Sequence, residues 1–223
     1  MRTPVAWPRS VDRHKAGPID SLLDRELWEH GWDHARLVLR ALAVAVPPGV
    51  VLGVAAARRP RLAAVLLGVA GVLFTIPSLA LFGLLVAPLG LGTTPAVAAL
   101  ALYSLLPVLR NTIVGLGGVP ADVEEAARGM GMSEWQSLRR VRLPLALPVI
   151  VSGIRVAAVT SVGIGTIASL VAAGGLGDLI FAGLRAGDRN RILEATLAVV
   201  ALALAFDATL GLLERVLSRS RRV

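Results

Sequence analysis

Five long apolar runs limit the fold of this 223-residue chain more than any other feature. A helix needs about 20 mostly apolar residues to cross the hydrocarbon of a bilayer. The runs lie at residues 34–57, 62–88, 95–116, 145–173 and 192–217. Only 17% of residues are charged, whereas soluble domains carry about a quarter, so the chain has too little polar surface for water. We therefore predict an all-α, polytopic bundle of about five membrane-spanning helices.

The runs divide the chain into three parts. Residues 1–33 are expected to form an N-terminal tail with a short amphipathic stretch at 19–32, which either lies in the membrane interface or extends the first span. Residues 34–217 form the predicted transmembrane domain, and 218–223 a basic tail. Prolines fall inside the first two runs, at Pro47, Pro48 and Pro77, where neighbouring helices can satisfy the carbonyls that they free.

Basic residues between the runs predict the orientation. Segments 58–61, 118–144 and 218–223 are rich in arginine, whereas 89–94 carries no charge. The positive-inside rule places the basic segments in the cytoplasm, with the N-terminus outside and the C-terminus inside. The outer loop predicted after the fourth run blurs this pattern, since it contains Arg185, Arg189 and Arg191 beside Asp178 and Asp188.

Composition argues against several other classes of protein. The chain has no cysteine, which excludes disulfides and cysteine-bound metals. Its three histidines, His14, His30 and His34, lack zinc-type spacing and are expected at or outside the membrane interface, so we predict no metal site. The net charge of +8 suits topology signals and contact with anionic lipid better than nucleic acid. No paired carboxylates or nucleophile constellation in the runs indicates an enzyme.

The loop at 118–144 has the pattern of two short helices. Acidic residues come early, as suits a helix N-terminus, and Gly129 and Gly131 then interrupt the helical pattern. Ser133 and Gln136 are spaced as a capping box for a second helix, which Pro144 is expected to end. From spacing alone, this hairpin either docks on a soluble partner or lies on the lipid surface.

A resemblance favours the docking role. Glu125-Ala126-Ala127, then Gly131, then Val141-Arg142-Leu143-Pro144 resembles the EAA loop of binding-protein-dependent ABC importer permeases, with Val141 replacing the family's isoleucine. The resemblance implies a coupling helix that docks on an ATPase subunit. It also implies that Glu125, Ala126, Ala127 and Gly131 are the contact and turn positions, and that Val141, Leu143 and Pro144 complete the motif.

Other segments resemble the osmoprotectant branch of these permeases, whose members import glycine betaine, choline, carnitine or proline betaine. They lie at 75–80, 109–112, 126–132 and 174–178. The resemblance implies a subunit in the plasma membrane of a prokaryote. A methionine-type amino-acid importer remains an alternative, because its loop is similar. A secondary transporter is a weaker one, because the chain has few midplane charges and no inverted repeat.

The resemblance also implies partners and cofactors. No P-loop pattern occurs in the chain, so ATP and magnesium are expected on separate ATPase subunits, with no cofactor bound by this chain. A second permease subunit, identical or homologous, would complete the pathway. Aromatic residues make up only 4% of the chain, too few for a convincing ammonium cage, so capture is assigned to a separate extracellular binding protein.

Two further sets of residues are candidates for function. Arg155 and Asp207 lie at matching depth in the fourth and fifth runs, and we predict that they pair, either to hold the two spans together or to serve transport. The second set follows the fourth run and forms either a helix-ending turn or an outer gate. It consists of Gly174, Gly175, Gly177 and Asp178.

Overall fold

The structure, a computed structural model, describes residues 25–219, so most of the N-terminal tail and the last four residues lie outside it. Between these limits the chain forms helices and no strand. The helices are α1 (Arg25–Ala56), α2 (Pro60–Thr75), α3 (Ser78–Leu89), α4 (Thr93–Gly117), α5 (Ala121–Gly129), α6 (Glu134–Ser137), the π-helical turn η3 (Leu138–Arg142), α7 (Leu143–Gly165), the 3₁₀ segment η4 (Thr166–Val171), α8 (Leu176–Ala186) and α9 (Arg189–Arg219).

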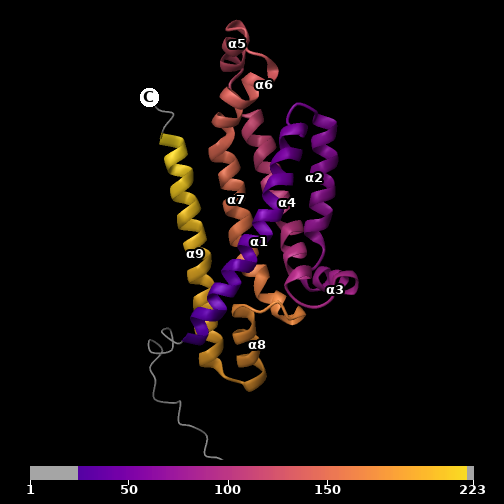
Figure 1. Ribbon diagram of the computed structural model, residues 1–223, viewed down its shortest axis with the longest axis vertical. Coiled ribbons are helices and arrows are strands. Elements are labelled where there is room, and N and C mark those ends of the chain that lie inside the picture. The colour runs from indigo at the N-terminus through magenta and orange to yellow at the C-terminus, as the bar shows by residue number, and fades with distance from the viewer. Residues whose placement is uncertain (1–24, 220–223) are drawn as a thin grey trace, which may run out of the picture.

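The body of the molecule is formed by the long helices α1, α4, α7 and α9 (Figure 1). α4 packs between α1 and α7, and α7 packs in turn on α9. Small residues let these backbones approach closely, as is common in membrane bundles. A Cβ on Gly49 would lie 2.8 Å from Val108, and one on Gly53 would lie 2.5 Å from Thr112, so only glycine fits the α1–α4 contact at these two positions.

The predicted all-α membrane bundle is confirmed. Four helical segments among the described residues are long and apolar enough to cross a membrane: α1, α4, the segment 134–171 and α9. A fifth is reached only if α2 and α3 count as one span, because they meet at an angle of 96°. The second predicted span, 62–88, is therefore not one straight helix but a bent pair.

The bend follows from the proline at its centre. Pro77 disfavours helical geometry in the residue before it, and Ile76 is extended, with ψ at 129°. The break leaves the Ile76 carbonyl without a helical partner, and the hydroxyl of Tyr103 on α4 donates a hydrogen bond to it. A neighbouring helix thus satisfies a carbonyl that proline frees, as the sequence predicts.

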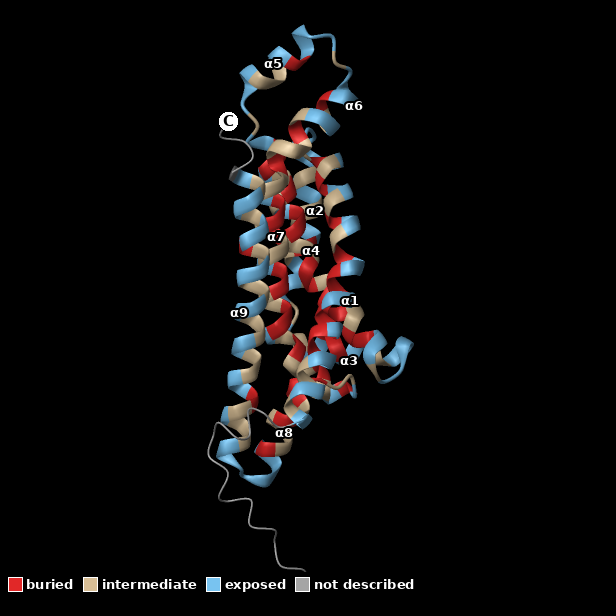
Figure 2. Cartoon of the chain, turned by 60° about the vertical axis from the view of Figure 1, so that its left-hand side comes forward, coloured by how far each residue is buried: buried red, intermediate tan, exposed pale blue. Residues whose placement is uncertain are grey.

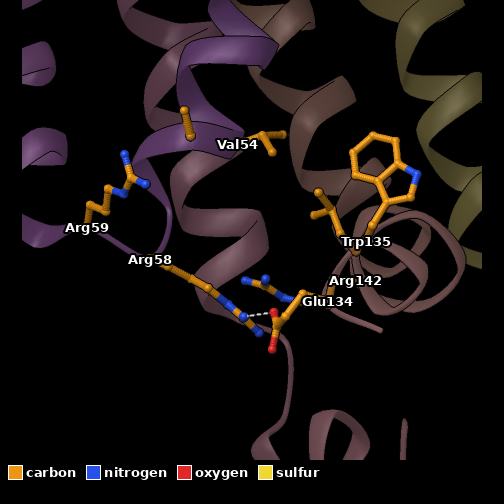
Figure 3. A pocket seen from close by; sticks show the side chains of 8 residues that line it. Val54, Arg58, Arg59, Glu134, Trp135 and Arg142 are labelled. Carbon is orange, nitrogen blue, oxygen red and sulfur yellow. Dashed lines mark hydrogen bonds and ion pairs between the residues drawn. The ribbon is translucent and has the colours of Figure 1, made fainter. Parts of the chain in front are cut away.

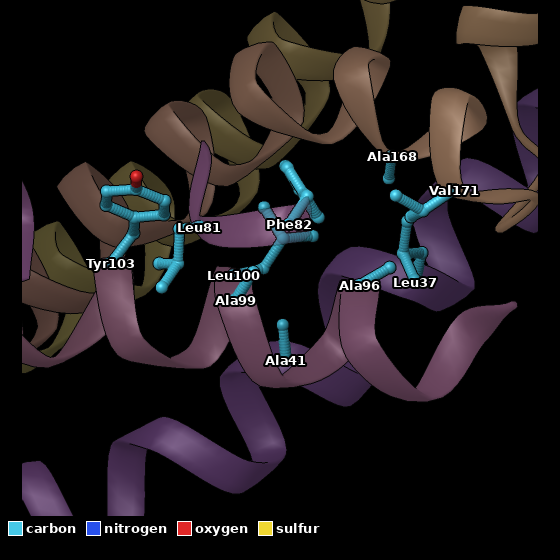
Figure 4. Packing of buried hydrophobic residues seen from close by; sticks show 10 residues of the cluster. All are labelled: Leu37, Ala41, Leu81, Phe82, Ala96, Ala99, Leu100, Tyr103, Ala168 and Val171. Atoms are coloured by element: carbon cyan, nitrogen blue, oxygen red, sulfur yellow. The ribbon is translucent and has the colours of Figure 1, made fainter. Parts of the chain in front are cut away.

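An apolar cluster fixes α3 against the rest of the bundle (Figure 4). Leu81 and Phe82 of α3 are buried against Leu37 of α1, Leu100 of α4 and Val171 of η4. Because lipid is about as apolar as these side chains, close van der Waals packing stabilises the contact rather than removal from water. The short helix is therefore held by packing from three separate elements.

The fourth span is longer than predicted and is not interrupted by Pro144. α6, η3 and α7 follow one another without a break, so Pro144 does not end the second helix of the hairpin. The π turn explains the difference. Proline lacks a backbone N–H and clashes with the carbonyl one turn before it, and the wider turn at 138–142 absorbs both effects.

Two segments at the end of the bundle where α1 begins differ from their predictions or complete them. The stretch from residue 25 to 32 is continuous with α1, so within the described residues it extends the first span. The outer segment predicted as a loop after the fourth run contains the helix α8, whose apolar face packs on α9 and α1. Asp178 in its first turn and Arg185 in its last suit the helix dipole.

Burial follows the expected pattern of a membrane protein (Figure 2). Buried residues gather along α1, α4 and α7, where these helices face one another. α9 exposes large apolar side chains along its length, among them Leu193, Leu197, Leu204 and Leu212. Such a surface suits lipid or another subunit rather than water.

Candidate functional site

The hairpin formed by α5, the turn at 130–133 and α6 projects beyond the ends of α1 and α9 (Figure 1). We refer to residues 121–137 as the α5–α6 hairpin. It connects α4 to α7, so both ends of the hairpin continue into membrane-spanning helices. A force on the hairpin would therefore act directly on two helices of the bundle.

A glycine turn closes α5. Gly131 adopts a φ of +76°, a left-handed conformation that glycine adopts at little cost. The N–H of Gly131 bonds to the Arg128 carbonyl, and the N–H of Met132 bonds to the Ala127 carbonyl. These two bonds form a Schellman motif, which satisfies carbonyls at the helix end. Gly131 thus acts through its backbone conformation.

The predicted capping box starts α6. The Ser133 hydroxyl accepts a hydrogen bond from the Gln136 N–H at 3.2 Å, and the Gln136 side chain accepts one from the Ser133 N–H at 2.8 Å. Reciprocal bonds of this kind satisfy two backbone donors at a helix start. They give the hairpin a defined second arm.

The motif residues divide into an outward and an inward set. Glu125 and Ala126 are exposed, whereas Ala127 is almost completely buried. Two large apolar side chains, Met130 and Trp135, are also about two-thirds exposed on the hairpin. Exposed apolar residues next to a carboxylate are typical of a surface that binds another protein.

The remaining motif residues anchor the hairpin to the bundle. Leu143 packs against an apolar cluster that contains Leu116, Ala146 and Ile150. Val141 is half-buried, and Pro144 is half-buried in the first turn of α7. These positions therefore lie between the hairpin and the membrane-spanning part of α7.

An ion cluster that is not predicted from the sequence joins the hairpin to the α1–α2 loop and to η3. The Glu124 carboxylate accepts a hydrogen bond from Arg58 Nη2 at 2.9 Å, and its other oxygen lies 2.8 Å from Arg142 Nε. Arg58 also contacts Glu134 (Figure 3). From the sequence, Arg58 and Arg142 are interpreted only as topology signals. Arg142 differs from the other arginines of the loop because it is buried, and only the structure shows this.

An open pocket of about 390 Å³ adjoins this cluster (Figure 3). Its lining comes from the end of α1, the α1–α2 loop and α6 with η3: Val54, Ala55, Arg58, Arg59, Glu134, Trp135, Leu138 and Arg142. Quaternary ammonium groups are held by several aromatic faces, and only Trp135 contributes one here. The pocket therefore does not have the composition of an osmolyte cage.

The structure brings Arg155 and Asp207 together. Arg155 Nε lies 2.6 Å from Asp207 Oδ1, and Nη2 lies 2.7 Å from Oδ2, a bidentate pair between α7 and α9. Glu214 adds a longer contact of 3.4 Å. Gly211 leaves room for the guanidinium, because a Cβ there would lie 3.3 Å from Arg155 Cζ.

The glycine-rich segment after η4 forms a tight turn and a close contact. Ala172 ends η4 in a left-handed conformation, and Gly174 and Gly175 both have positive φ. A Cβ on Gly177 would overlap the Thr166 carbonyl. Asp178 lies 4.0 Å from His30 Nδ1. The segment is thus packed against η4 and α1 rather than free in solution.

His34 is buried, contrary to its expected place at or outside the membrane interface. Its Nε2 lies 3.0 Å from the Val162 carbonyl, which the change to 3₁₀ geometry frees, since the Thr166 N–H bonds to Gly163 instead. Gly165 and Gly175 make space for the ring, because a Cβ on either would lie 3.0 Å from it. Two glycines and a free carbonyl therefore allow a polar ring inside the bundle.

Residues 49–223 match the family described as "Binding-protein-dependent transport system inner membrane component". The chain belongs to this family. It is therefore a membrane-embedded transport permease. Within its described residues, no group of three or more histidine, aspartate or glutamate side chains could hold a metal ion.

Two relatives match the permease along most of its length. The osmoprotectant import permease protein OsmW of Salmonella typhimurium is 44% identical over 209 residues, which cover 91% of this chain and 93% of OsmW. The carnitine transport permease protein OpuCB of Listeria monocytogenes is 43% identical over 189 residues, or 85% of each chain. The permease thus resembles both relatives over most of its length.

A solved structure supports the fold. The permease superposes on a chain from inward-facing conformations of the MetNI methionine ABC transporter with a TM-score of 0.70, covering 91% of this chain and 99% of that one. The sequence identity is 22%, so this likeness concerns the fold alone.

Proposed function

We propose that this permease is the transmembrane subunit of an ATP-driven importer of quaternary-ammonium osmoprotectants, of the glycine betaine, choline, carnitine or proline betaine type. The observation that carries the proposal is the exposed Glu125-Ala126 face of a hairpin that joins two membrane-spanning helices. The relatives named for osmoprotectant and carnitine transport support the substrate class, because their identity of more than 40% extends over most of the chain.

In this proposal the α5–α6 hairpin couples transport to ATP hydrolysis. Separate ATPase subunits bind ATP and magnesium, and their closure moves the hairpin. Because the hairpin continues into α4 and α7, its displacement re-orients these helices and alternates access to the pathway. Glu125, Ala126 and the exposed Met130 and Trp135 contact the ATPase, whereas Gly131 shapes the turn.

The proposal assigns the remaining partners by the same reasoning. A second permease subunit, identical or homologous, completes the pathway, and a separate extracellular protein captures the substrate. The N-terminus lies outside and the C-terminus in the cytoplasm of a prokaryotic cell. The arginine-rich segments 58–61 and 118–144 support this orientation, since basic loops favour the cytoplasmic side. In this proposal, the turn at 174–178 lies at the outer gate of the pathway.

A methionine-type importer is the second candidate. The structural likeness to a methionine transporter supports it only at the level of the fold, given 22% identity. The relatives with twice that identity are named for osmoprotectants and carnitine, which favours the first candidate.

Uptake measurements test the proposal. Radiolabelled glycine betaine, carnitine and methionine would each be offered to vesicles that contain the permease, its ATPase subunits and its binding protein. We expect ATP-dependent uptake of glycine betaine or carnitine. Uptake of methionine alone would discard the substrate class, and uptake without the ATPase would overturn the coupling role.

Gly131→Asp tests the hairpin in the same assay, with Gly131→Asn as its matched control. Both side chains have nearly the same shape, and asparagine tolerates left-handed backbone. Only aspartate adds a charge to the docking face. We expect Gly131→Asp to abolish ATP-dependent uptake in a permease that still inserts, and Gly131→Asn to retain most of it. Equal uptake by the two variants would count against a docking face at this turn.

Single cysteines test the proposed orientation, because the natural chain has none. Trp28→Cys and Met130→Cys place one thiol at an exposed position at each end of the molecule. A membrane-impermeant maleimide should label Trp28→Cys in intact cells and Met130→Cys only after the cells are opened. The reverse pattern would invert the assigned topology.

A further inference from the structure

The α5–α6 hairpin has three connections to the membrane-spanning bundle. Two are covalent, through α4 and through the continuous helix into α7. The third is ionic: Arg58, in the loop between α1 and α2, reaches Glu124 on α5 and Glu134 on α6. Among residues 25–219, these are the ion pairs that join the hairpin to the first two helices.

Glu124 is the centre of the ionic connection. One carboxylate oxygen accepts from Arg58, and the other faces Arg142 at the base of the hairpin. Two arginines and two glutamates make the cluster neutral as a whole. Arg142 is only 6% exposed, and a buried guanidinium requires a counter-charge. Glu124 supplies that charge and thereby fixes the distance between α5, η3 and the α1–α2 loop.

Two neighbouring glutamates of α5 face different surroundings. Glu124 is half-buried and bound to two arginines, whereas Glu125 is exposed beside Ala126. Consecutive residues on a helix are about 100° apart, so one side chain faces the bundle while the next faces outward. The same turn of helix therefore presents a docking carboxylate and an anchoring carboxylate.

We propose that Glu124 and Arg58 are positioning residues that transmit movement of the hairpin to α1 and α2. The inference rests on the coupling role proposed above and adds a route to it. Packing of α1 along α4 and α7 couples these helices along their length. The Arg58–Glu124 clamp adds a direct link at the end that carries the hairpin, where α1 meets α2.

Arg58→Gln is the sharpest test in the complete importer with its ATPase and binding protein. Loss of Arg58 leaves Glu124 paired with Arg142 and leaves Glu134 exposed to solvent, so no buried charge is unpaired and assembly should not be impaired. We expect uptake per ATP hydrolysed to fall about tenfold, within the range typical of coupling between sites. Glu124→Gln should give the same loss. Asp122→Asn, an exposed charge on the same helix, is the matched control and should retain coupling.

A double variant separates coupling from folding. If Glu124→Gln assembles poorly because Arg142 is left unpaired, Glu124→Gln with Arg142→Gln removes that charge and should restore assembly while uptake per ATP stays low. Wild-type coupling in Arg58→Gln, or an equal loss in Asp122→Asn, would overturn the positioning role.

A substrate-independent readout separates this inference from the proposed function. Val69→Cys places a spin label on an exposed position of α2 in an otherwise cysteine-free chain. ATP should change its mobility in the wild-type background and leave it unchanged with Arg58→Gln. If no osmoprotectant is imported but this difference persists, the substrate class is wrong and the clamp stands. An identical ATP response in both backgrounds would overturn the clamp.

Discussion

Arg155 donates two hydrogen bonds to Asp207 in a bidentate ion pair, with N–O distances of 2.6 and 2.7 Å. The pair joins α7 to α9 well inside both membrane-spanning helices. Each side chain is more than a third exposed in the isolated chain. Since charges in a membrane avoid lipid, this face of α7 and α9 is expected to meet a cavity or a second subunit in the assembled importer.

Removing one partner of this pair should harm assembly more than removing both. Asp207→Asn leaves Arg155 with only the longer contact to Glu214, at 3.4 Å, and should lower the yield of assembled complex several-fold by size-exclusion chromatography. Arg155→Gln with Asp207→Asn should recover much of it. Glu214→Gln removes an equal charge from the weaker contact and should be milder. A double variant no better than Asp207→Asn would show that the pair does not stabilise assembly.

Gly177→Ala should destabilise the end of the bundle formed by η4 and α8. The new Cβ would overlap the Thr166 carbonyl, and a backbone group cannot move aside as a flexible side chain can. Overpacking of this kind costs about 1–3 kcal/mol, measurable as a lower Tm of the purified permease. Gly163→Ala, nearby in α7 with open space around it, should be neutral or stabilising. The prediction fails if both variants melt alike.

Tyr103→Phe should weaken the bend between α2 and α3. The variant keeps the ring and its edge contact with Phe74 but loses the hydrogen bond to the Ile76 carbonyl. Leaving such a carbonyl without a partner costs about 1–3 kcal/mol, which thermal unfolding would detect. Thr75→Val removes a hydroxyl from the same region, one that bonds only to its own helix, and should cost less. A smaller loss for Tyr103→Phe than for Thr75→Val would contradict this account.

Ser133→Ala should loosen the second arm of the hairpin without affecting the membrane-spanning helices. It removes the acceptor for the Gln136 N–H, a change that typically costs about 1 kcal/mol. Amide hydrogen exchange should become faster in 134–137 and stay unchanged in α4. Ser133→Asp retains a capping oxygen and should protect these amides as the wild type does. Unchanged exchange in Ser133→Ala would show that packing alone holds α6.

The sequence by itself determined those features that depend on local patterns. The apolar runs determined the membrane bundle, because runs of about 20 apolar residues are long enough to cross a bilayer and would be poorly solvated by water. The hairpin followed from Gly131 and from the Ser133–Gln136 spacing, since caps and left-handed turns are made by residues a few positions apart. Arg155 and Asp207 could be matched by depth alone, because each helix adds a constant rise per residue.

Only the tertiary structure decided the features that depend on contacts between distant segments. The 96° bend at Pro77 requires Tyr103, which lies on another helix, to satisfy the freed carbonyl. The Glu124 cluster and the burial of His34 bring together residues more than 60 positions apart. No period or spacing in the sequence records such proximity, because it arises from how the helices pack.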